Sequence, residues 1–428
     1  MIIHVVSPGE TLLGIARTYN VVPQNFLADN GLNLNSKALI GQALVIQQPE
    51  LSHIVRSGDT LLSIAQEYGV EVITLLRNNY FLKGEFSIAP GQTIVIRYAG
   101  ENRSKTFMTN GYAYPFIPPA LLAEQLPYMS YITPFTYGLR ENGSIYKLEN
   151  DEWMINRAAS LNVKSLMHLS TLTESGTFSN ERANLLFTNP ALQSTLISEI
   201  IANMQNKGYS GLDIDFEFIY PEDKFDYVIF LQNVYRAINP LGYPLFSALA
   251  PKTSDQQRGT LYEGHDYYAI AASVDKVLLM TYEWGYTYSA PMAVAPIRSV
   301  EQVIRYGLTR IPPEKILMGI PTYGYDWLLP YERGVTRATS LSPVECIRIA
   351  ERYNAQINFD ETAQTPWFRY TDENGRLHEV WFEDARSINA KLRLAANYDL
   401  AGLGYWNLNR EFPQNLVVLN SGYYIESV

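Results

Sequence analysis

Eight short apolar runs, each followed by a helical pattern, set the tightest limit on the fold of this 428-residue chain. The runs occupy residues 108–114, 128–137, 165–170, 211–218, 245–250, 276–282, 316–323 and 401–406. Strands that alternate with helices form parallel sheets, because each helix returns the chain to the same edge. Eight such units predict an α/β fold, the TIM (β/α)8 barrel, with functional residues at the carboxyl ends of its strands.

The seventh run is followed by a long segment of mixed character, at about residues 325–381. It contains a helical stretch, 343–354, and two strand-like pieces, 367–371 and 379–382. A loop of that length without structure of its own is uncommon. We therefore predict a small α+β insertion that raises one wall of the cleft, within a barrel domain of residues 105–428.

The first hundred residues contain an internal repeat, in which residues 4–12 recur as residues 53–61, an offset of 49. Each copy has the pattern of a strand, a glycine turn, a threonine helix cap, two helices and a closing strand. This pattern predicts two βααβ modules of about 45 residues each. The modules occupy residues 1–48 and 52–98, with connections expected at 47–52 and 99–104.

The order and spacing of these residues resemble the LysM family. Modules of that family bind chitin or peptidoglycan, glycans that contain N-acetylglucosamine, in a groove beside the loops after the first strand and the second helix. The resemblance implies two glycan-binding modules. The alternative is a pair of stable modules that bind no ligand.

The most informative residues lie in the fourth run, where acids alternate with large apolar side chains. Asp213, Asp215 and Glu217 stand two positions apart and so share one face of a strand. In a closed barrel this face is the interior, because the apolar set takes the helix side. Repulsion and desolvation should keep a proton on the set near neutral pH, as a general acid requires. A structural acidic network is the alternative.

The acidic run resembles the signature of glycoside hydrolase family 18, Asp-x-x-Asp-x-Asp-x-Glu, with Ser210 in place of the first Asp. The resemblance implies that Glu217 donates a proton to the glycosidic oxygen. It implies that Asp215 orients the N-acetyl group of the substrate and that Asp213 shares a proton with Asp215. The nucleophile would be the acetamido oxygen of the substrate, giving an oxazolinium intermediate and retention, an exception to the two-carboxylate scheme.

Other positions match motifs of the same family. Met280, Tyr282 and Glu283 resemble its Met-x-Tyr-Asp, in which the Tyr hydrogen-bonds the acetamido group; Glu283 stands in place of the Asp. Trp406 ends the last run, where the family places a Trp as the floor beneath the sugar. The further substrate contacts expected from the resemblance are Tyr112, Tyr323, Asp326 and Trp327, the last two standing where many chitinases carry Arg.

The few cysteines and histidines limit other chemistry. The single cysteine, Cys346, excludes an intrachain disulfide and a cysteine-based zinc site, and its apolar surroundings predict a buried structural thiol. His168, in the third run, is expected to be a buried imidazole with satisfied hydrogen bonds. We expect no metal and no cofactor.

Charge and hydropathy restrict the partners. The chain has 33 basic and 43 acidic residues, a net charge of -10, which counts against nucleic acid or anionic lipid. No apolar run approaches the ~20 residues that span a bilayer. The N-terminus lacks the basic, apolar and cleavage regions of a secretory signal. We expect a monomer that binds glycan, does not bind membranes and has no cleavable signal peptide.

The modules and the barrel both point to β-1,4-linked N-acetylglucosamine polymers. Their combination, without an export signal, resembles the germination enzymes of endospore-forming bacteria, N-acetylglucosaminidases that cut spore cortex peptidoglycan and its fragments. The resemblance implies a peptidoglycan hydrolase of the spore coat or cortex. The alternatives are a chitinase acting on chitin oligosaccharides, a lectin-like barrel that binds without cutting, and modules that serve mainly for assembly into the coat.

Overall fold

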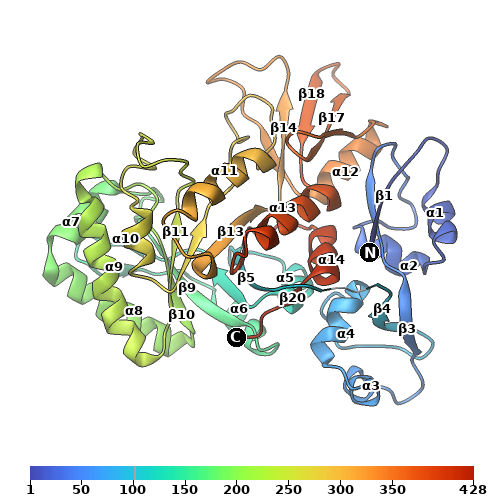
Figure 1. Ribbon diagram of the computed structural model, residues 1–428, viewed down its shortest axis with the longest axis horizontal. Coiled ribbons are helices and arrows are strands. Elements are labelled where there is room, and N and C mark those ends of the chain that lie inside the picture. Colours follow the sequence, from blue (N-terminus) through green and yellow to red (C-terminus); the bar gives the residue numbers. More distant parts are fainter. Residues whose placement is uncertain (101–102) are drawn as a thin grey trace.

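The computed structural model describes residues 1–100 and 103–428, and a closed parallel barrel forms its larger part (Figure 1). Each strand pairs in parallel with the next, and the last pairs with the first, which confirms the predicted (β/α)8 barrel. The barrel strands are β5 (Thr106–Ala113), β6 (Tyr131–Pro134), β9 (Lys164–Ser170), β10 (Gly211–Asp215), β11 (Leu245–Leu249), β12 (Lys276–Leu279), β13 (Ile316–Pro321) and β19 (Gly402–Trp406).

Several strands are shorter than the apolar runs that predict them. The run at 128–137 begins in a 3-10 turn, η2 (Leu126–Tyr128), before β6. More important for function, β10 ends at Asp215, so Glu217 lies in the loop beyond the strand. The run continues past the strand because Phe216 is still buried against a helix after pairing has ended.

The barrel helices cover the outer face of the sheet. They are α5 (Pro119–Gln125), α6 (Glu152–Ala159), α7 (Asn180–Thr188), α8 (Pro190–Lys207), α9 (Lys224–Ile238), α10 (Tyr267–Ala271), α11 (Ile297–Gly307), α13 (Ala385–Asn397) and α14 (Pro413–Gly422). In the longest, α8, residues at the two ends set the helix boundaries. The Asn189 side chain caps the first amides, Pro190 occupies the first turn, and Gly208 ends the helix at φ 79°.

The insertion after the seventh strand is an antiparallel sheet with one helix, as predicted. Its strand order is β15-β14-β18-β17-β16. The elements are β14 (Gly324–Leu328), β15 (Thr339–Leu341), α12 (Pro343–Arg352), β16 (Asn358–Asp360), β17 (Thr365–Thr371) and β18 (Leu377–Trp381). Cys346 of α12 is a buried free thiol, in an apolar cluster that includes Phe368 and Val380.

The two N-terminal modules have the predicted βααβ order. The first contains β1 (Ile2–Val5), α1 (Leu12–Thr18), α2 (Pro23–Asp29) and β2 (Ala43–Ile46); the second contains β3 (Pro49–Ile54), α3 (Leu61–Tyr68), α4 (Val72–Asn78) and β4 (Thr93–Tyr98). Thr11 and Thr60 cap the first helices, as expected. Residues 49–52 of the expected connection are strand, and residues 101–102 of the second connection lie outside the described residues.

Both modules pack against the barrel beside α14, and the first module also lies next to α12 (Figure 1). The Gln414 side-chain amide of α14 donates to the Asn30 side-chain oxygen at 2.9 Å, and the Asn420 amide donates to Asn78 at 3.0 Å. At Gly41, a Cβ atom would lie 1.9 Å from the Ile357 carbonyl oxygen of the insertion. The loop after the second helix, which the LysM resemblance places beside the glycan groove, is therefore a docking element in the first module.

None of the described helices is long and apolar enough to cross a membrane.

Candidate active site

Three acids stand at the carboxyl end of β10, where a barrel keeps its functional residues. Asp213 is fully buried, Asp215 is 8% exposed and Glu217 is partly exposed in the following loop. Ile214 and Phe216 point to the helix side, and the Phe216 ring stacks on Phe230 of α9 at 5.7 Å between centroids. The apolar alternation thus directs the acids into the barrel, as the period of two predicts.

Tyr112 holds the innermost acid in place. Its hydroxyl donates to Asp213 Oδ2 at 2.7 Å, and its ring also lines the cavity above. Tyr112 comes from β5, three strands away from β10 in the sheet order. The barrel interior therefore brings together two side chains that are 101 positions apart.

His168 faces the acids from the neighbouring strand β9, where it pairs in register with Asp213. Its Nδ1 lies 2.6 Å from Thr136 Oγ1, while Nε2 lies 3.6 Å from Asp215 Oδ2 and 3.9 Å from Asp213 Oδ2. Within the described residues, Nε2 has no hydrogen-bond partner. The imidazole is buried as expected, but the expectation of satisfied hydrogen bonds is wrong on the side that faces the acids.

Burial governs protonation of this set. It raises the pKa of Asp213 to about 6, against the opposing effects of His168 and the Tyr112 hydroxyl. Burial also raises the pKa of Asp215. The pKa of Glu217 is raised by burial and then by the charges of Asp215 and Glu283. At least one proton therefore stays on the three acids near neutral pH, as a general acid requires.

His168 does not supply a compensating cation. Burial lowers the pKa of its imidazole to about 4, although Asp213 acts in the opposite direction. The ring is therefore neutral at neutral pH. A neutral imidazole leaves the carboxyl groups to share protons among themselves.

A cavity of about 650 Å³ opens above the acids. Its volume is in the range of pockets that bind small ligands or a few sugar units. It brings together most of the residues predicted from sequence: Tyr112, Asp215, Glu217, Met280, Tyr282, Glu283 and Trp406. Tyr114, Phe135 and Trp284 also line it and were not predicted, although Tyr114 stands two positions after Tyr112 and so shares its face of the chain.

Tyr323 does not line the cavity but contacts Glu283, which does. Its hydroxyl donates to Glu283 Oε1, and the Tyr325 hydroxyl donates to the same atom at 3.1 Å. Glu283 is held at φ 67°, a left-handed conformation that is uncommon outside glycine. Burial raises the pKa of Glu283, against the effect of the two tyrosine hydroxyls. Tyr323 thus positions a cavity residue.

Asp326 and Trp327 do not line this cavity. Asp326 accepts hydrogen bonds from the Tyr370 hydroxyl at 2.6 Å and pairs with His378 Nδ1 at 2.9 Å, both within the insertion sheet. Trp327 is fully buried and donates from Nε1 to the Ser289 carbonyl at 2.7 Å. Both stand on β14, which leads the chain from the barrel into the insertion: Asp326 bonds within the insertion sheet, whereas Trp327 packs into the barrel core and fastens β14 to the loop after β12.

Comparison with known proteins decides the family. The sequence model described as "Glycosyl hydrolases family 18" matches residues 125–411, which is more than half of the chain. The chain belongs to glycosyl hydrolases family 18. The LysM domain model matches residues 4–47 and 53–97, so this family 18 glycoside hydrolase carries two LysM domains and binds glycan.

Relatives of this family 18 enzyme match two thirds or more of its length. The cortical fragment-lytic enzyme of Bacillus subtilis (strain 168) is 42% identical over 299 residues, 69% of this chain and 68% of its own. That of Bacillus anthracis is 34% identical over 418 residues, 96% of this chain and 95% of its own. The solved structure of the Bacillus cereus spore cortex-lytic enzyme SleL is 33% identical, with a TM-score of 0.84, covering 99% of this chain and 98% of that chain.

Proposed function

We propose that the protein is an N-acetylglucosaminidase that hydrolyses β-1,4 bonds after N-acetylglucosamine in spore cortex peptidoglycan or its fragments. The similarity to cortical fragment-lytic enzymes across both LysM domains and the barrel supports this substrate. One observation carries the activity: Glu217, whose pKa is raised by burial, lines an open cavity together with Asp215.

Glu217 is the general acid. Its carboxyl group keeps a proton near neutral pH and gives it to the glycosidic oxygen as the bond from that oxygen to C1 breaks. Asp215 and Glu283, the other acids of the cavity, do not protonate the leaving group. After the leaving sugar departs, the Glu217 carboxylate takes a proton from the water that attacks C1.

The nucleophile is the carbonyl oxygen of the substrate's own N-acetyl group. It bonds to C1 as the leaving group departs, which gives an oxazolinium ion and explains why no second carboxylate acts as nucleophile. The Asp215 carboxylate accepts the N–H of the acetamido group and stabilises the positive charge. Tyr282 donates its hydroxyl to the acetamido oxygen, and attack by water from the face of the departed sugar retains the configuration.

Asp213 and Tyr112 set the charge on Asp215. Asp213 shares a proton with Asp215, and the 2.7 Å hydrogen bond from Tyr112 holds Asp213 at a fixed position. Because the pKa of Asp213 is raised to about 6, this proton is gained or lost near neutral pH. Met280 and Trp406 provide the apolar surface beneath the sugar, and Glu283 contacts its polar groups.

The LysM domains hold the enzyme on the glycan. We place them at residues 1–48 and 52–98, with the barrel at 105–428 and its insertion at about 325–381. A monomer is supported by the apolar surface that both domains bury against the barrel of the same chain. A place in the spore coat or cortex is supported by the similarity to spore cortex-lytic enzymes.

The decisive experiment compares the wild type with Glu217→Gln on spore cortex fragments. The substitution keeps the shape of the side chain and removes the proton donor, so kcat should fall by about 10²–10⁴-fold. Mass spectrometry of the products should show N-acetylglucosamine at the new reducing ends in the wild-type digest. Binding of the variant to insoluble glycan should be unchanged, because the LysM domains are intact.

Retained turnover in Glu217→Gln would contradict the assignment of the acid. Chitin oligosaccharides serve as the matched substrate: faster cleavage of these than of cortex fragments would indicate a chitinase. Binding of both glycans without release of reducing ends by the wild type would indicate a lectin-like protein.

A further inference from the structure

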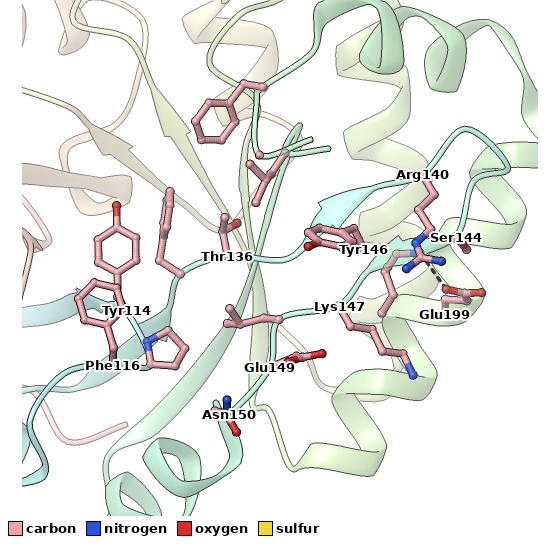
Figure 2. Close-up of a pocket in the computed structure, with 17 residues that line it drawn as sticks. Tyr114, Phe116, Thr136, Arg140, Ser144, Tyr146, Lys147, Glu149, Asn150 and Glu199 are labelled. Carbon is pink, nitrogen blue, oxygen red and sulfur yellow. Dashed lines mark hydrogen bonds between the residues drawn. The ribbon is translucent and has the colours of Figure 1, made fainter. Parts of the chain in front are cut away.

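A second and larger cavity, of about 1020 Å³, adjoins the catalytic cavity (Figure 2). Tyr114, Phe135 and Phe178 line both cavities, so a bound chain can extend from one into the other. The outer wall of the second cavity is a short hairpin, β7 (Gly138–Leu139) and β8 (Ile145–Tyr146). The proposed reaction uses none of the residues on this hairpin.

The two cavities differ in charge. Asp215, Glu217 and Glu283 line the catalytic cavity, and no lysine or arginine is among the described residues that line it. The second cavity is lined by Arg140 and Lys147. An anionic group on the glycan would be repelled by the catalytic acids and attracted to this neighbouring wall.

Both cations are available to a ligand. The Arg140 guanidinium lies over the Tyr146 ring, 5.8 Å from its centroid, and its Nε is 3.9 Å from Glu174, too far for a hydrogen bond. Lys147 is exposed, lines the cavity and forms no ion pair with another described residue. Figure 2 shows Arg140 and Lys147 on the hairpin side of the cavity, across from Tyr114.

The two acids that line this cavity, Glu199 and Glu149, differ in their hydrogen bonds. Glu199 accepts the backbone N–H of Ile145 at 2.8 Å, so its carboxylate fastens the hairpin to α8. Glu149 is exposed and lines the cavity beside Lys147. The wall therefore presents two cations, of which Arg140 has only a distant ion pair with Glu174, and one exposed carboxylate, which complements a ligand with several carboxylates and an amine.

The opposite end of the cavity is aromatic. The rings of Tyr114 and Phe116 stack at 5.1 Å between centroids and 18° between planes, and Phe116 is 76% exposed. A flat exposed aromatic surface suits the face of a sugar ring. A glycan lying on these rings would direct a substituent of its sugar toward the hairpin.

We propose that the second cavity binds the peptide substituent of peptidoglycan, with Arg140 and Lys147 contacting its carboxylates and Glu149 its amine. This proposal rests on the proposed function, since it assumes that the glycan is cut in the adjoining cavity. It assigns to the hairpin the distinction between peptidoglycan and chitin, because chitin has no charged substituent to place there. It also explains how an acidic protein accepts an acidic substrate.

The test uses two preparations of the same cortex fragments, one with peptides intact and one from which an amidase has removed them. The double variant Arg140→Gln, Lys147→Gln should raise KM for the peptide-bearing fragments about 10-fold or more, because charged hydrogen bonds contribute ~1.5–3 kcal/mol each. KM for the stripped fragments and for chitin oligosaccharides should change less than about twofold. Arg236→Gln, on the exposed face of α9, is the control and should change neither.

The outcomes separate this proposal from the function on which it rests. Equal effects of the double variant on both preparations, or no effect on either, would overturn the peptide assignment. A larger rise in KM for the stripped fragments would also overturn it, because the cations would then bind the lactyl carboxylate, which the amidase frees from its amide bond to the peptide. Wild-type enzyme that cuts neither preparation would contradict the proposed function itself. Unchanged kcat on chitin oligosaccharides shows that the variants are folded.

Discussion

Histidine and carboxylate lie together in the LysM domains and in the barrel, with opposite consequences for the acid. In the second LysM domain, His53 Nε2 lies 2.8 Å from Asp59, and the pKa of Asp59 is lowered. In the barrel, His168 Nε2 lies 3.6 Å from Asp215, and the pKa of Asp215 is raised. The pairing of residue types therefore does not decide the charge.

Backbone donors and exposure make the difference. The N–H of Arg56 donates to Asp59 at 2.7 Å, and this backbone hydrogen bond, followed by the His53 contact, lowers the pKa of the carboxyl group. The first domain repeats the arrangement with Glu10, which accepts the N–H of Ser7 at 2.6 Å. Such an acid is ionised and fastens a loop to a strand.

Asp213 and Asp215 of the barrel are buried but accept no comparable backbone hydrogen bond from the described residues. Oδ1 of both Asp213 and Asp215 has no hydrogen-bond partner among the described residues. A buried carboxylate with an oxygen that lacks a donor is costly, so the proton is retained, as the proposed general-acid chemistry requires. Histidine and aspartate therefore form a structural hydrogen-bonded pair at the surface of the LysM domain, whereas in the barrel interior the aspartate keeps its proton.

The largest expected effect within this comparison is that of Asp215→Asn. The substitution removes the charge that stabilises the oxazolinium ion in the proposed mechanism, and losses of such electrostatic stabilisation reduce kcat by about 10²–10³-fold. Steady-state kinetics on peptide-free cortex fragments measures it. A loss confined to KM would show that Asp215 only binds substrate.

The next effect is a displaced pH profile in Glu283→Gln. Since the charge of Glu283 helps to raise the pKa of Glu217, its removal should lower that pKa. If Glu217 is the general acid, as proposed, activity falls as pH rises through its pKa, so the alkaline limb of kcat/KM should move to lower pH. An alkaline limb at the wild-type position would show that the charge of Glu283 does not affect the pKa of Glu217, whatever the change in KM.

A smaller effect is expected for His168→Gln. In acid, where the His168 imidazole gains its charge, it lowers the pKa of Asp213, so without the imidazole this pKa should rise and the acid limb of the pH profile should move to higher pH. We expect about a fivefold lower kcat at the acid limb, equivalent to ~1 kcal/mol. A uniform loss at every pH would point to disturbed packing instead.

The smallest effect on activity is expected for Asp59→Asn, which alters the pair of His53 and Asp59. The pKa of Asp59 is lowered on folding, so the pair stabilises the domain above the ordinary pKa of the acid, and this stability is lost as pH falls through the folded pKa. Thermal unfolding should therefore show a lower Tm for the variant near neutral pH and convergence with the wild type in acid. Glu67→Gln, an exposed acid of α3, is the control, and kcat should be unchanged in both.

Local patterns in the sequence were enough to predict the barrel, the insertion and the two modules. Apolar runs that alternate with helical periods predict β/α units, and eight of them close a barrel. The spacing of Asp213 and Asp215 predicts their common direction into the barrel, since side chains in a strand alternate with a period of two. These inferences succeed because they depend on residues that are neighbours in the chain.

Contacts between residues that are distant in sequence could be identified only from the tertiary structure. The hydrogen bond between Gln414 and Asn30 joins positions 384 apart, and no local pattern predicts that the first LysM domain docks there. The same applies to Trp327, whose side chain is buried in the barrel core and bonds Ser289 instead of lining the cavity. It also applies to His168, whose Nε2 faces the acids without a hydrogen-bond partner among the described residues. Periodicity specifies which way a side chain points from its own element; which groups it meets depends on how the elements pack.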